Sequence, residues 1–186
     1  MLTNGELVKY AEAMLGHQYW YGTYGQKATK ALLGTKREQY PKYYNPNNYN
    51  TEWTCDGRKV FDCCGLIKGA IWCDGDPNAL PKYNASQDLS ANGMYEAAVE
   101  KGPINTLPEI SGICVRYNGH VGIYIGRGYV IEARGHDYGV VKTELKKRGW
   151  TDWYKCKFIN YTNQKDTIQV TTIIGDKTYT GILEEV

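Results

Sequence analysis

The chain has 186 residues, of which 42% are hydrophobic, and this suits one folded domain with a short appendage. Its formal net charge of +2 is too small to indicate a nucleic-acid-binding surface, and the basic cluster Lys146-Lys147-Arg148 is typical of a solvated surface. No apolar run approaches the ~20 residues that a membrane-spanning helix needs, so we expect no membrane span.

The N-terminal residues Met1–Glu6 lack a basic start followed by an apolar core, so we expect no signal peptide and synthesis in the cytosol. Cytosolic synthesis argues against a disulfide framework, although the number of cysteines is even. The cysteines are not spaced as C-x-x-C pairs, and only three histidines accompany them, so we expect neither a metal site nor another cofactor. The six cysteines are Cys55, Cys63, Cys64, Cys73, Cys114 and Cys156.

The first predicted helix covers residues 4–15. Thr3 or Asn4 can cap it, and Gly16 ends it. An apolar stripe along this helix is formed by Leu7, Ala11 and Leu15. Residues 17–22 follow as a short extended segment that is rich in aromatic side chains.

Residues 27–33 predict a second, short helix. Residues 41–53 are rich in Tyr, Asn and Pro, and the turn signal Asn45-Pro46 indicates a loop. This loop is interpreted either as one wall of a groove or as surface decoration, and the sequence does not decide between them.

The apolar spacing of Leu66, Ile67, Ala70 and Ile71 predicts a helix with Cys63 in its first turn. Asp62 is a suitable N-cap, and Gly75 with Pro77 stops the helix. The positive end of a helix stabilises a thiolate, which is the form of cysteine that attacks carbonyl groups. The alternative is a buried, inert cysteine, which is common for a free thiol.

The C-terminal half predicts a helix over residues 87–100, capped by Ser86, and then a run of strands. Hairpin signals at Asn118-Gly119 and at residues 126–128 indicate an antiparallel meander. Helices followed by such a meander predict the α+β class. The strands are expected at residues 113–117, 120–125, 129–134, 140–145 and 155–161.

A nucleophilic cysteine needs a histidine base, and His120 is the first candidate. Strand alternation puts His120 on the face opposite Val121 and Ile123, with space left beside it by Gly122. If residues 126–128 form a three-residue hairpin loop, Glu132 lies diagonal to His120 on the same face. Glu132 can then accept the second ring N–H of His120 and hold its tautomer.

Two other histidines are rivals for the role of base. His136 is followed by Asp137, but both lie between Gly135 and Gly139, where a His-Asp pair is more often turn chemistry. His17 could also lie near Cys63 in space, and the sequence does not exclude it.

Three motifs resemble those of the NlpC/P60 cysteine peptidases, a papain-like superfamily that cuts bacterial cell-wall peptides. Residues 61–67 read F-D-C-C-G-L-I and are similar to the family pattern D-C-S-G-L-V/I. Residues 119–126 read G-H-V-G-I-Y-I-G and are very close to G-H-V-G-I-Y-I/L-G. Residues 16–22 read G-H-Q-Y-W-Y-G and are similar to G-x-P-Y-x-W-G.

The resemblance implies that Cys63 is the nucleophile, His120 the general base and Glu132 the third polar residue. It also implies that Tyr19 lies near the nucleophile, where it stabilises the oxyanion or binds substrate, and Asp62 and Cys64 are expected beside it at the substrate. The departures are Cys64 in place of the usual serine, Gln18 in place of proline, Tyr21 in place of tryptophan, and a long insert between Tyr21 and Asp62.

The resemblance further implies cleavage of an amide bond in peptidoglycan stem peptides. With no signal peptide expected, the interpretation is a phage endolysin that reaches the wall through a holin or as part of a phage particle. The alternatives are a wall amidase or acyltransferase of the same superfamily, a host enzyme that recycles wall peptides, and a non-catalytic cell-wall-binding protein.

Two domain assignments follow. Residues 1–162 are expected to form the papain-like catalytic domain. Residues 163–186 are expected to form a β-hairpin extension or to begin a further module, with strands at residues 168–174 and 178–183. Because a lone hairpin is marginal in water, it must pack on the domain or pair with a partner chain, for example in a homodimer.

Overall fold

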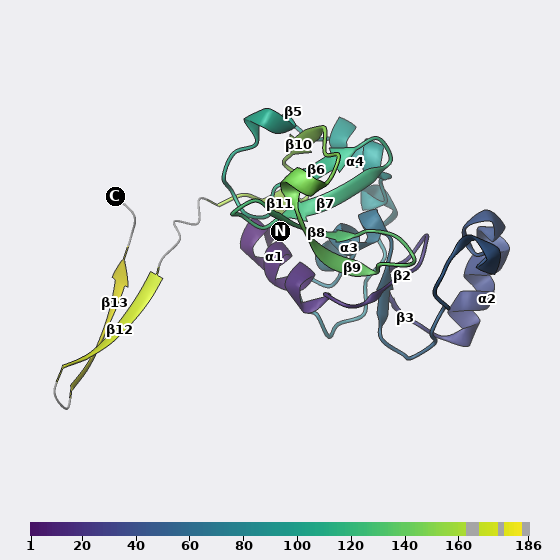
Figure 1. Cartoon of the computed structure of the whole chain (residues 1–186), viewed down its shortest axis with the longest axis horizontal. Coiled ribbons are helices and arrows are strands. Elements are labelled where there is room, and N and C mark those ends of the chain that lie inside the picture. The colour runs from purple at the N-terminus through teal and green to yellow at the C-terminus, as the bar shows by residue number, and fades with distance from the viewer. Residues whose placement is uncertain (163–167, 175–176, 184–186) are drawn as a thin grey trace.

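A computed structural model of the chain describes residues 1–162, 168–174 and 177–183. Its main sheet has six strands, and helices pack against it (Figure 1). This mixed arrangement confirms the α+β class. In spatial order the strands are β5 (Lys101–Pro103), β10 (Asp152–Tyr154), β6 (Cys114–Tyr117), β7 (His120–Tyr124), β8 (Tyr129–Ala133) and β9 (Val140–Glu144).

Strands β6 to β9 form the expected antiparallel meander. The strand expected over residues 155–161 is confirmed only at residues 159–160, and the sheet strand β10, which ends at Tyr154, was not expected. Trp153 and Tyr154 alternate between the apolar clusters on the two faces of the sheet, as consecutive strand residues must. The chain then turns away, and β11 (Ile159–Asn160) pairs in parallel with β1 (Leu2–Thr3).

A second, three-stranded sheet leads the chain into the cysteine helix. It consists of β2 (Gln18–Tyr19), β4 (Lys59–Phe61) and β3 (Tyr24–Lys27), with β4 in the middle. The extended segment that contains β2 is expected from the sequence, whereas β3 and β4 are not. Strands of three or four residues are too short to show the alternation that identifies a strand.

Helix α1 (Asn4–Ala13) begins at Thr3, which forms a capping box with Glu6. Leu7 is fully buried, as the expected stripe requires, whereas Leu15 is 41% exposed. The assignment of Leu15 to the stripe is wrong because the helix ends at Ala13, before the stripe reaches it.

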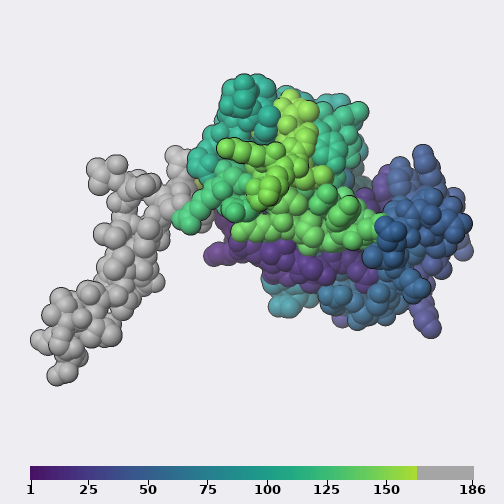
Figure 2. Space-filling view, viewed as in Figure 1, coloured from purple at the N-terminus to yellow at the C-terminus, as the bar shows by residue number. Residues whose placement is uncertain are grey.

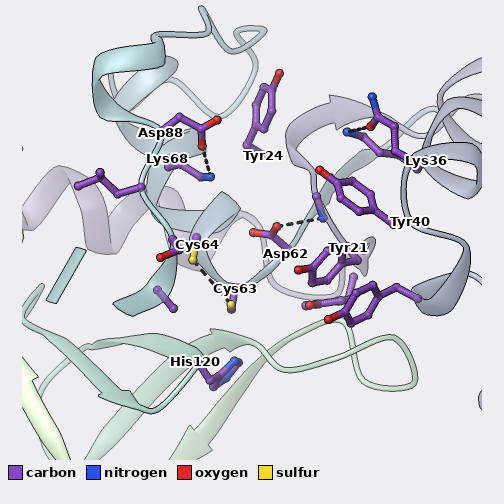
Figure 3. Close-up of a pocket in the computed structure, with 18 of the residues that line it drawn as sticks. Tyr21, Tyr24, Lys36, Tyr40, Asp62, Cys63, Cys64, Lys68, Asp88 and His120 are labelled. Atoms are coloured by element: carbon purple, nitrogen blue, oxygen red, sulfur yellow. Dashed lines mark hydrogen bonds and ion pairs between the residues drawn. The ribbon is translucent and has the colours of Figure 1, made fainter. Parts of the chain in front are cut away.

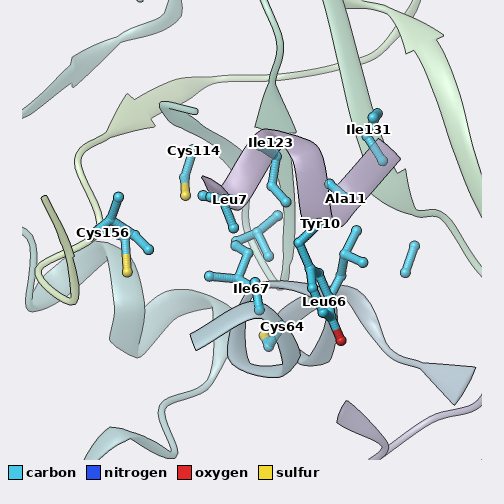
Figure 4. Packing of buried hydrophobic residues seen from close by; sticks show 14 of the residues in the cluster. Leu7, Tyr10, Ala11, Cys64, Leu66, Ile67, Cys114, Ile123, Ile131 and Cys156 are labelled. Atoms are coloured by element: carbon cyan, nitrogen blue, oxygen red, sulfur yellow. The ribbon is translucent and has the colours of Figure 1, made fainter. Parts of the chain in front are cut away.

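Helix α3 (Cys63–Trp72) begins at the expected cap, Asp62, whose side chain accepts the Gly65 N–H at 2.6 Å. The helix packs unusually close to the preceding chain, since a Cβ at Gly65 would lie 1.8 Å from the carbonyl oxygen of Thr23. This contact and the cap fix the first turn of α3 in position. The core between α1, α3 and the sheet is drawn in Figure 4 and includes Leu7, Tyr10, Leu66, Ile67, Ile123 and Ile131.

Two helices differ from their expected bounds. Helix α2 (Lys30–Gln39) begins and ends later than residues 27–33. The long helix expected over residues 87–100 is replaced by a 3₁₀ turn, η3 (Ala85–Gln87), and a short helix, α4 (Ala91–Glu96). The cap of α4 is Ser90 rather than Ser86, because the Ser90 hydroxyl accepts the Gly93 N–H at 3.1 Å.

The segment of residues 30–48, which begins with α2, projects from one side of the domain (Figures 1 and 2). It continues through two 3₁₀ turns, η1 (Pro41–Tyr43) and η2 (Pro46–Asn48). Two further 3₁₀ turns are η4 (Ile104–Thr106) and η5 (Leu145–Lys147). Within the described ranges, no helix combines the length and apolarity that crossing a membrane requires.

Near the C-terminus, β12 (Ile168–Ile174) and β13 (Lys177–Leu183) pair with each other as an antiparallel hairpin, which confirms the two expected strands. The connection between the two strands, at residues 175–176, lies outside the described residues. The domain boundary at residue 162, and the pairing of two chains through this hairpin, stay predictions.

Candidate active site

Cys63 and His120 come from different layers of the fold and line the same cavity (Figure 3). Cys63 is the first residue of α3, and His120 is the first residue of β7. The side chain of His120 is 10% exposed, so it acts in a largely dry environment. The cavity has a volume of about 870 Å³.

The predicted contact between His120 and Glu132 is present. Nε2 of His120 lies 2.7 Å from a carboxylate oxygen of Glu132. The register that the prediction required is also present, since Ile123 lies opposite Ile131 and the Ile125 N–H donates to the Tyr129 carbonyl at 2.9 Å. With Nε2 engaged by Glu132, Nδ1 is the nitrogen of His120 that remains for Cys63.

A second apolar cluster, which includes Trp150 and Val130, covers the face of the sheet that carries His120. Trp150 stacks on His120 with ring centres 5.5 Å apart and an angle of 12° between the planes. The space left by Gly122 is filled, because a Cβ there would lie 2.6 Å from Val130 and 3.0 Å from Trp150. Trp150 therefore shields the catalytic histidine candidate from water on this side.

Glu132 is fully buried and accepts four hydrogen bonds. Besides His120, its carboxylate accepts from Arg148 at 2.7 and 2.9 Å and from the Thr143 hydroxyl at 2.8 Å. Burial alone would raise the pKa of Glu132, but the bonds from His120, Arg148 and Thr143 outweigh it and lower this pKa to about 2. Glu132 is thus held as an anion.

Arg148 is the main site residue that sequence analysis missed. It belongs to the basic triplet that was predicted to be solvated, and that prediction is wrong for Arg148, whose side chain is only 18% exposed. Lys146 and Lys147 are exposed, as expected. The sequence offers only an indirect sign of Arg148. A carboxylate that is predicted to lie behind His120 needs hydrogen-bond donors, but no sequence pattern near Glu132 identifies the cation that supplies them.

Cys63 is the thiol whose charge the site stabilises. Its pKa lies well below the usual value because the Cys64 thiol donates to it, and because the His120 imidazolium is adjacent; burial opposes both effects. The two sulfur atoms are 3.9 Å apart. Burial would lower the pKa of His120, but its bonds to Cys63 and Glu132 raise it to about 9. Both shifts favour a thiolate on Cys63 beside an imidazolium on His120.

Cys64 points into the core beneath α3 and is 7% exposed. Its hydrogen bond to Cys63, followed by burial, raises the pKa of Cys64. Cys64, which stands where the similar motif has serine, therefore supplies a donor to Cys63 rather than a second thiolate.

Asp62 links the cysteine to the neighbouring loop. Its two oxygens accept the backbone N–H groups of Gly65 and Gly22, the latter at 3.0 Å. Burial and the nearby charge of Cys63 raise the pKa of Asp62 to about 7. Potential metal ligands of Asp62, Cys63 and Cys64 lie within 4.8 Å of one another, although both Asp62 oxygens already have these backbone donors.

Tyr19 also lines the cavity, as expected from its place in the third motif. Burial, and then the charge of Cys63, raise the pKa of its hydroxyl, so the group remains a donor at neutral pH. The structure therefore brings all six predicted site residues to one place: Cys63, His120, Glu132, Tyr19, Asp62 and Cys64.

The rival histidines have other contacts. The ring nitrogens of His136 face the carbonyl oxygens of Thr51 at 2.9 Å and of Tyr19 at 3.3 Å, and its ring stacks on Trp53. Asp137 accepts hydrogen bonds from the same segment, at Asn50 and Thr51. His17 faces the Met14 carbonyl at 3.0 Å. His136 and Asp137 thus fasten the residue 49–53 segment to the domain.

The insert between Tyr21 and Asp62 forms one wall of the cavity, mainly through α2 and η1. Of residues 41–53, which were interpreted as a possible groove wall, only Tyr43 lines this cavity. The other wall residues of the insert come before residue 41. The wall residues from this insert are Lys36, Gln39, Tyr40 and Tyr43. On the other side, Figure 3 shows the ion pair of Lys68 and Asp88, whose atoms are 2.6 Å apart.

The profile of the NlpC/P60 family matches residues 48–158 of the chain. Among curated proteins, the chain is 29% identical over 120 residues to the probable endopeptidase p60 of Listeria innocua, covering 64% of this chain and 22% of that protein. It is 32% identical over 98 residues to the probable endopeptidase p60 of Listeria monocytogenes, covering 53% of this chain and 18% of that protein. The chain thus spans about a fifth of the length of these relatives.

Solved structures with the same fold include a mutated form of RipA, the resuscitation promoting factor interacting protein. It aligns with a TM-score of 0.51 at 18% identity, covering 82% of this chain and 61% of that one. A hypothetical invasion protein of Mycobacterium tuberculosis aligns with a TM-score of 0.50 at 20% identity, covering 85% of this chain and 62% of that one. At these identities the likeness concerns the fold alone, and it agrees with the α+β class.

Proposed function

Because the chain belongs to the NlpC/P60 family, we propose that it is a peptidoglycan hydrolase, a cysteine peptidase that cleaves an amide bond in cell-wall stem peptides. The proposal rests mainly on a chain of contacts that runs from Cys63 through His120 and Glu132 to Arg148. His120 adjoins the thiol, Glu132 holds the far nitrogen of His120 at 2.7 Å, and Arg148 holds Glu132. The two Listeria relatives are named probable endopeptidases, and this supports the same reaction class.

In the first step the Cys63 thiolate attacks the carbonyl carbon of the scissile amide and the C=O electrons move to oxygen. We assign the stabilisation of this oxyanion to backbone N–H groups in the first turn of α3 and to the Tyr19 hydroxyl, which belongs to a residue of the cavity wall. The loss of one such donor typically lowers the rate by about a hundredfold or more.

In the second step His120 protonates the leaving nitrogen from Nδ1, and the C–N bond breaks to release an amine and leave a thioester on Cys63. Water then attacks the thioester, and neutral His120 accepts its proton. The products are a carboxylic acid, which releases its proton to solvent, and the regenerated thiolate–imidazolium pair. Throughout the cycle Glu132 keeps the proton on Nε2 and the ring in orientation.

The direct experiment is mass spectrometry of purified peptidoglycan after incubation with wild-type protein and with Cys63→Ala. We expect soluble stem fragments with a new amine within the stem, from wild type only. Cys55→Ala is the matched control, since Cys55 lies outside the cavity lining, and it is expected to release the same fragments.

Three outcomes contradict the proposal. Equal release by Cys63→Ala shows that another group is the nucleophile, and no release from several wall types shows that peptidoglycan is not the substrate. A free lactyl carboxyl with an intact stem identifies a wall amidase instead. The phage endolysin role remains a prediction, and lysis of host cells after co-expression with a holin tests it.

A further inference from the structure

Lys36 is a buried cation in the wall of the cavity that holds Cys63. It lies on α2, its residue is only 9% exposed, and its Nζ donates to Oε1 of Gln39 at 3.0 Å. Within residues 1–162, none of the ion pairs involves Lys36, so its charge has a neutral amide as its hydrogen-bond partner. A buried charge without a counter-ion is costly, and such a group gains from an anionic ligand.

The position of Lys36 is tied to the nucleophile through Tyr40. Nζ of Lys36 lies 5.5 Å from the centre of the Tyr40 ring. That ring packs on Gly22 so closely that a Cβ at Gly22 would lie 2.5 Å from it. The Gly22 N–H in turn donates to Asp62, the residue before Cys63. The α2 wall is therefore fastened to the end of α3 where the chemistry is expected.

The other charged side chains of the cavity are already compensated. Lys68 and Asp88 form an ion pair with atoms 2.6 Å apart, and Asp62 accepts two backbone N–H groups. In Figure 3, Lys36 and Tyr40 lie on one side of the cavity and the Lys68–Asp88 pair on the other. Burial lowers the pKa of Lys36, while the charges of Asp62 and Asp88 oppose this effect. A bound carboxylate would favour the charged form of Lys36 more strongly.

We propose that Lys36 and Tyr40 form a carboxylate-binding subsite, which selects peptides that carry a free carboxylate near the scissile amide over the same peptides with that group amidated. One carboxylate oxygen is placed to accept from the Lys36 ammonium, and the Tyr40 hydroxyl lines the same cavity as a donor for the other. This inference deepens the proposed function and rests on it for the identity of the peptide, but its binding can be measured without turnover.

The experiment uses two synthetic stem peptides that differ only in having their carboxylates free or converted to carboxamides. Their dissociation constants are measured by calorimetry with the full chain carrying Cys63→Ala, alone and combined with Lys36→Met. We expect the free-carboxylate peptide to bind about tenfold more tightly than its twin, and Lys36→Met to abolish that preference. Lys36→Arg, which keeps the charge, is expected to retain it.

Lys30→Met is the matched control, because Lys30 is an exposed lysine at the start of the same helix. It is expected to leave both dissociation constants unchanged. Equal binding of the two peptides by Cys63→Ala, binding of neither, or an equal loss for both with Lys36→Met overturns the subsite. Turnover by the protein with intact Cys63 is measured in parallel. Binding preference without any cleavage would reject the proposed function but keep the subsite.

Discussion

Replacement of Glu132 by glutamine is predicted to disable the base by changing its tautomer. In wild type the carboxylate accepts from His120, from Thr143 and twice from Arg148. Arg148 can only donate, so the variant amide must turn its oxygen toward Arg148 and its NH₂ toward His120. Nε2 of His120 then becomes an acceptor, and the proton of the neutral ring moves to Nδ1, which faces Cys63. A neutral His120 in this tautomer cannot take a proton there.

The magnitude follows from the pKa of His120. In wild type this pKa is raised from 6.5 to about 9, against burial, by the bonds to Cys63 and Glu132. Without the carboxylate we expect it to fall by roughly one unit or more, and each unit is about 1.4 kcal/mol. The upper pH limit of the thiolate–imidazolium pair falls with it. Protonated His120 stabilises the folded state fully below pH 6.5, and this stabilisation is lost as the pH rises through about 9. Because the pKa of His120 is raised less in the variant, the variant loses less folding free energy over the same pH range.

The substitution also breaks a buried ion pair. Such a loss costs about 3 kcal/mol or more, even allowing for the 18% exposure of Arg148. For a chain of this size, that corresponds to a melting temperature lower by roughly 6–12 °C. A variant of the partly exposed Glu144, which pairs with Lys147 on the surface, is the control, and Glu144→Gln is expected to change little.

The assay combines NMR titration of the His120 ring with thermal unfolding at pH 6. The reasoning is refuted if Glu132→Gln titrates at the wild-type pKa, or if its melting temperature matches that of Glu144→Gln. A lower melting temperature with an unchanged His120 titration would mean that Glu132 is needed for packing only.

Three further predictions concern the groups around this pair. Cys64→Ala removes the donor to Cys63 and should raise the midpoint of the pH profile for alkylation of Cys63. Cys64→Ser keeps a donor and should keep this midpoint low. Identical profiles for the two variants would contradict the role given to the Cys64 thiol. Arg148→Met should lower the melting temperature by several degrees, because two charge-assisted bonds to a buried carboxylate are lost, and Lys147→Met should not. Thr3→Ala removes a capping box and should lower the free energy of unfolding in urea by about 1 kcal/mol; no change would show that the helix end is held by tertiary contacts alone.

The contact between His120 and Glu132 could be predicted because it depends on local information. A three-residue loop at residues 126–128 sets the register of β7 against β8, and the period of two then decides which side chains share a face. The cap at Asp62 was equally local, since the residue before an apolar helical run supplies it.

The failures came from contacts between distant segments. The apolar spacing over residues 87–100 fits a helix, but Gln87 and Asp88 are held by Trp72 and Lys68 on α3, which keeps this stretch out of a helix. Arg148 and Trp150 were missed for the same reason. Their roles depend on how the chain folds back after β9 to contact Glu132 and His120, and no local sequence pattern predicts this path.

The central claim, that Cys63 is held as the reactive thiolate, is tested most directly by limited alkylation with iodoacetamide at pH 6, followed by peptide mapping. At this pH an unperturbed thiol is ionised to well under about one per cent. We predict that Cys63 is modified first, at least about tenfold faster than free cysteine, and that Cys64 is not modified. First modification of Cys64, or a rate for Cys63 no higher than that of free cysteine, would contradict the account.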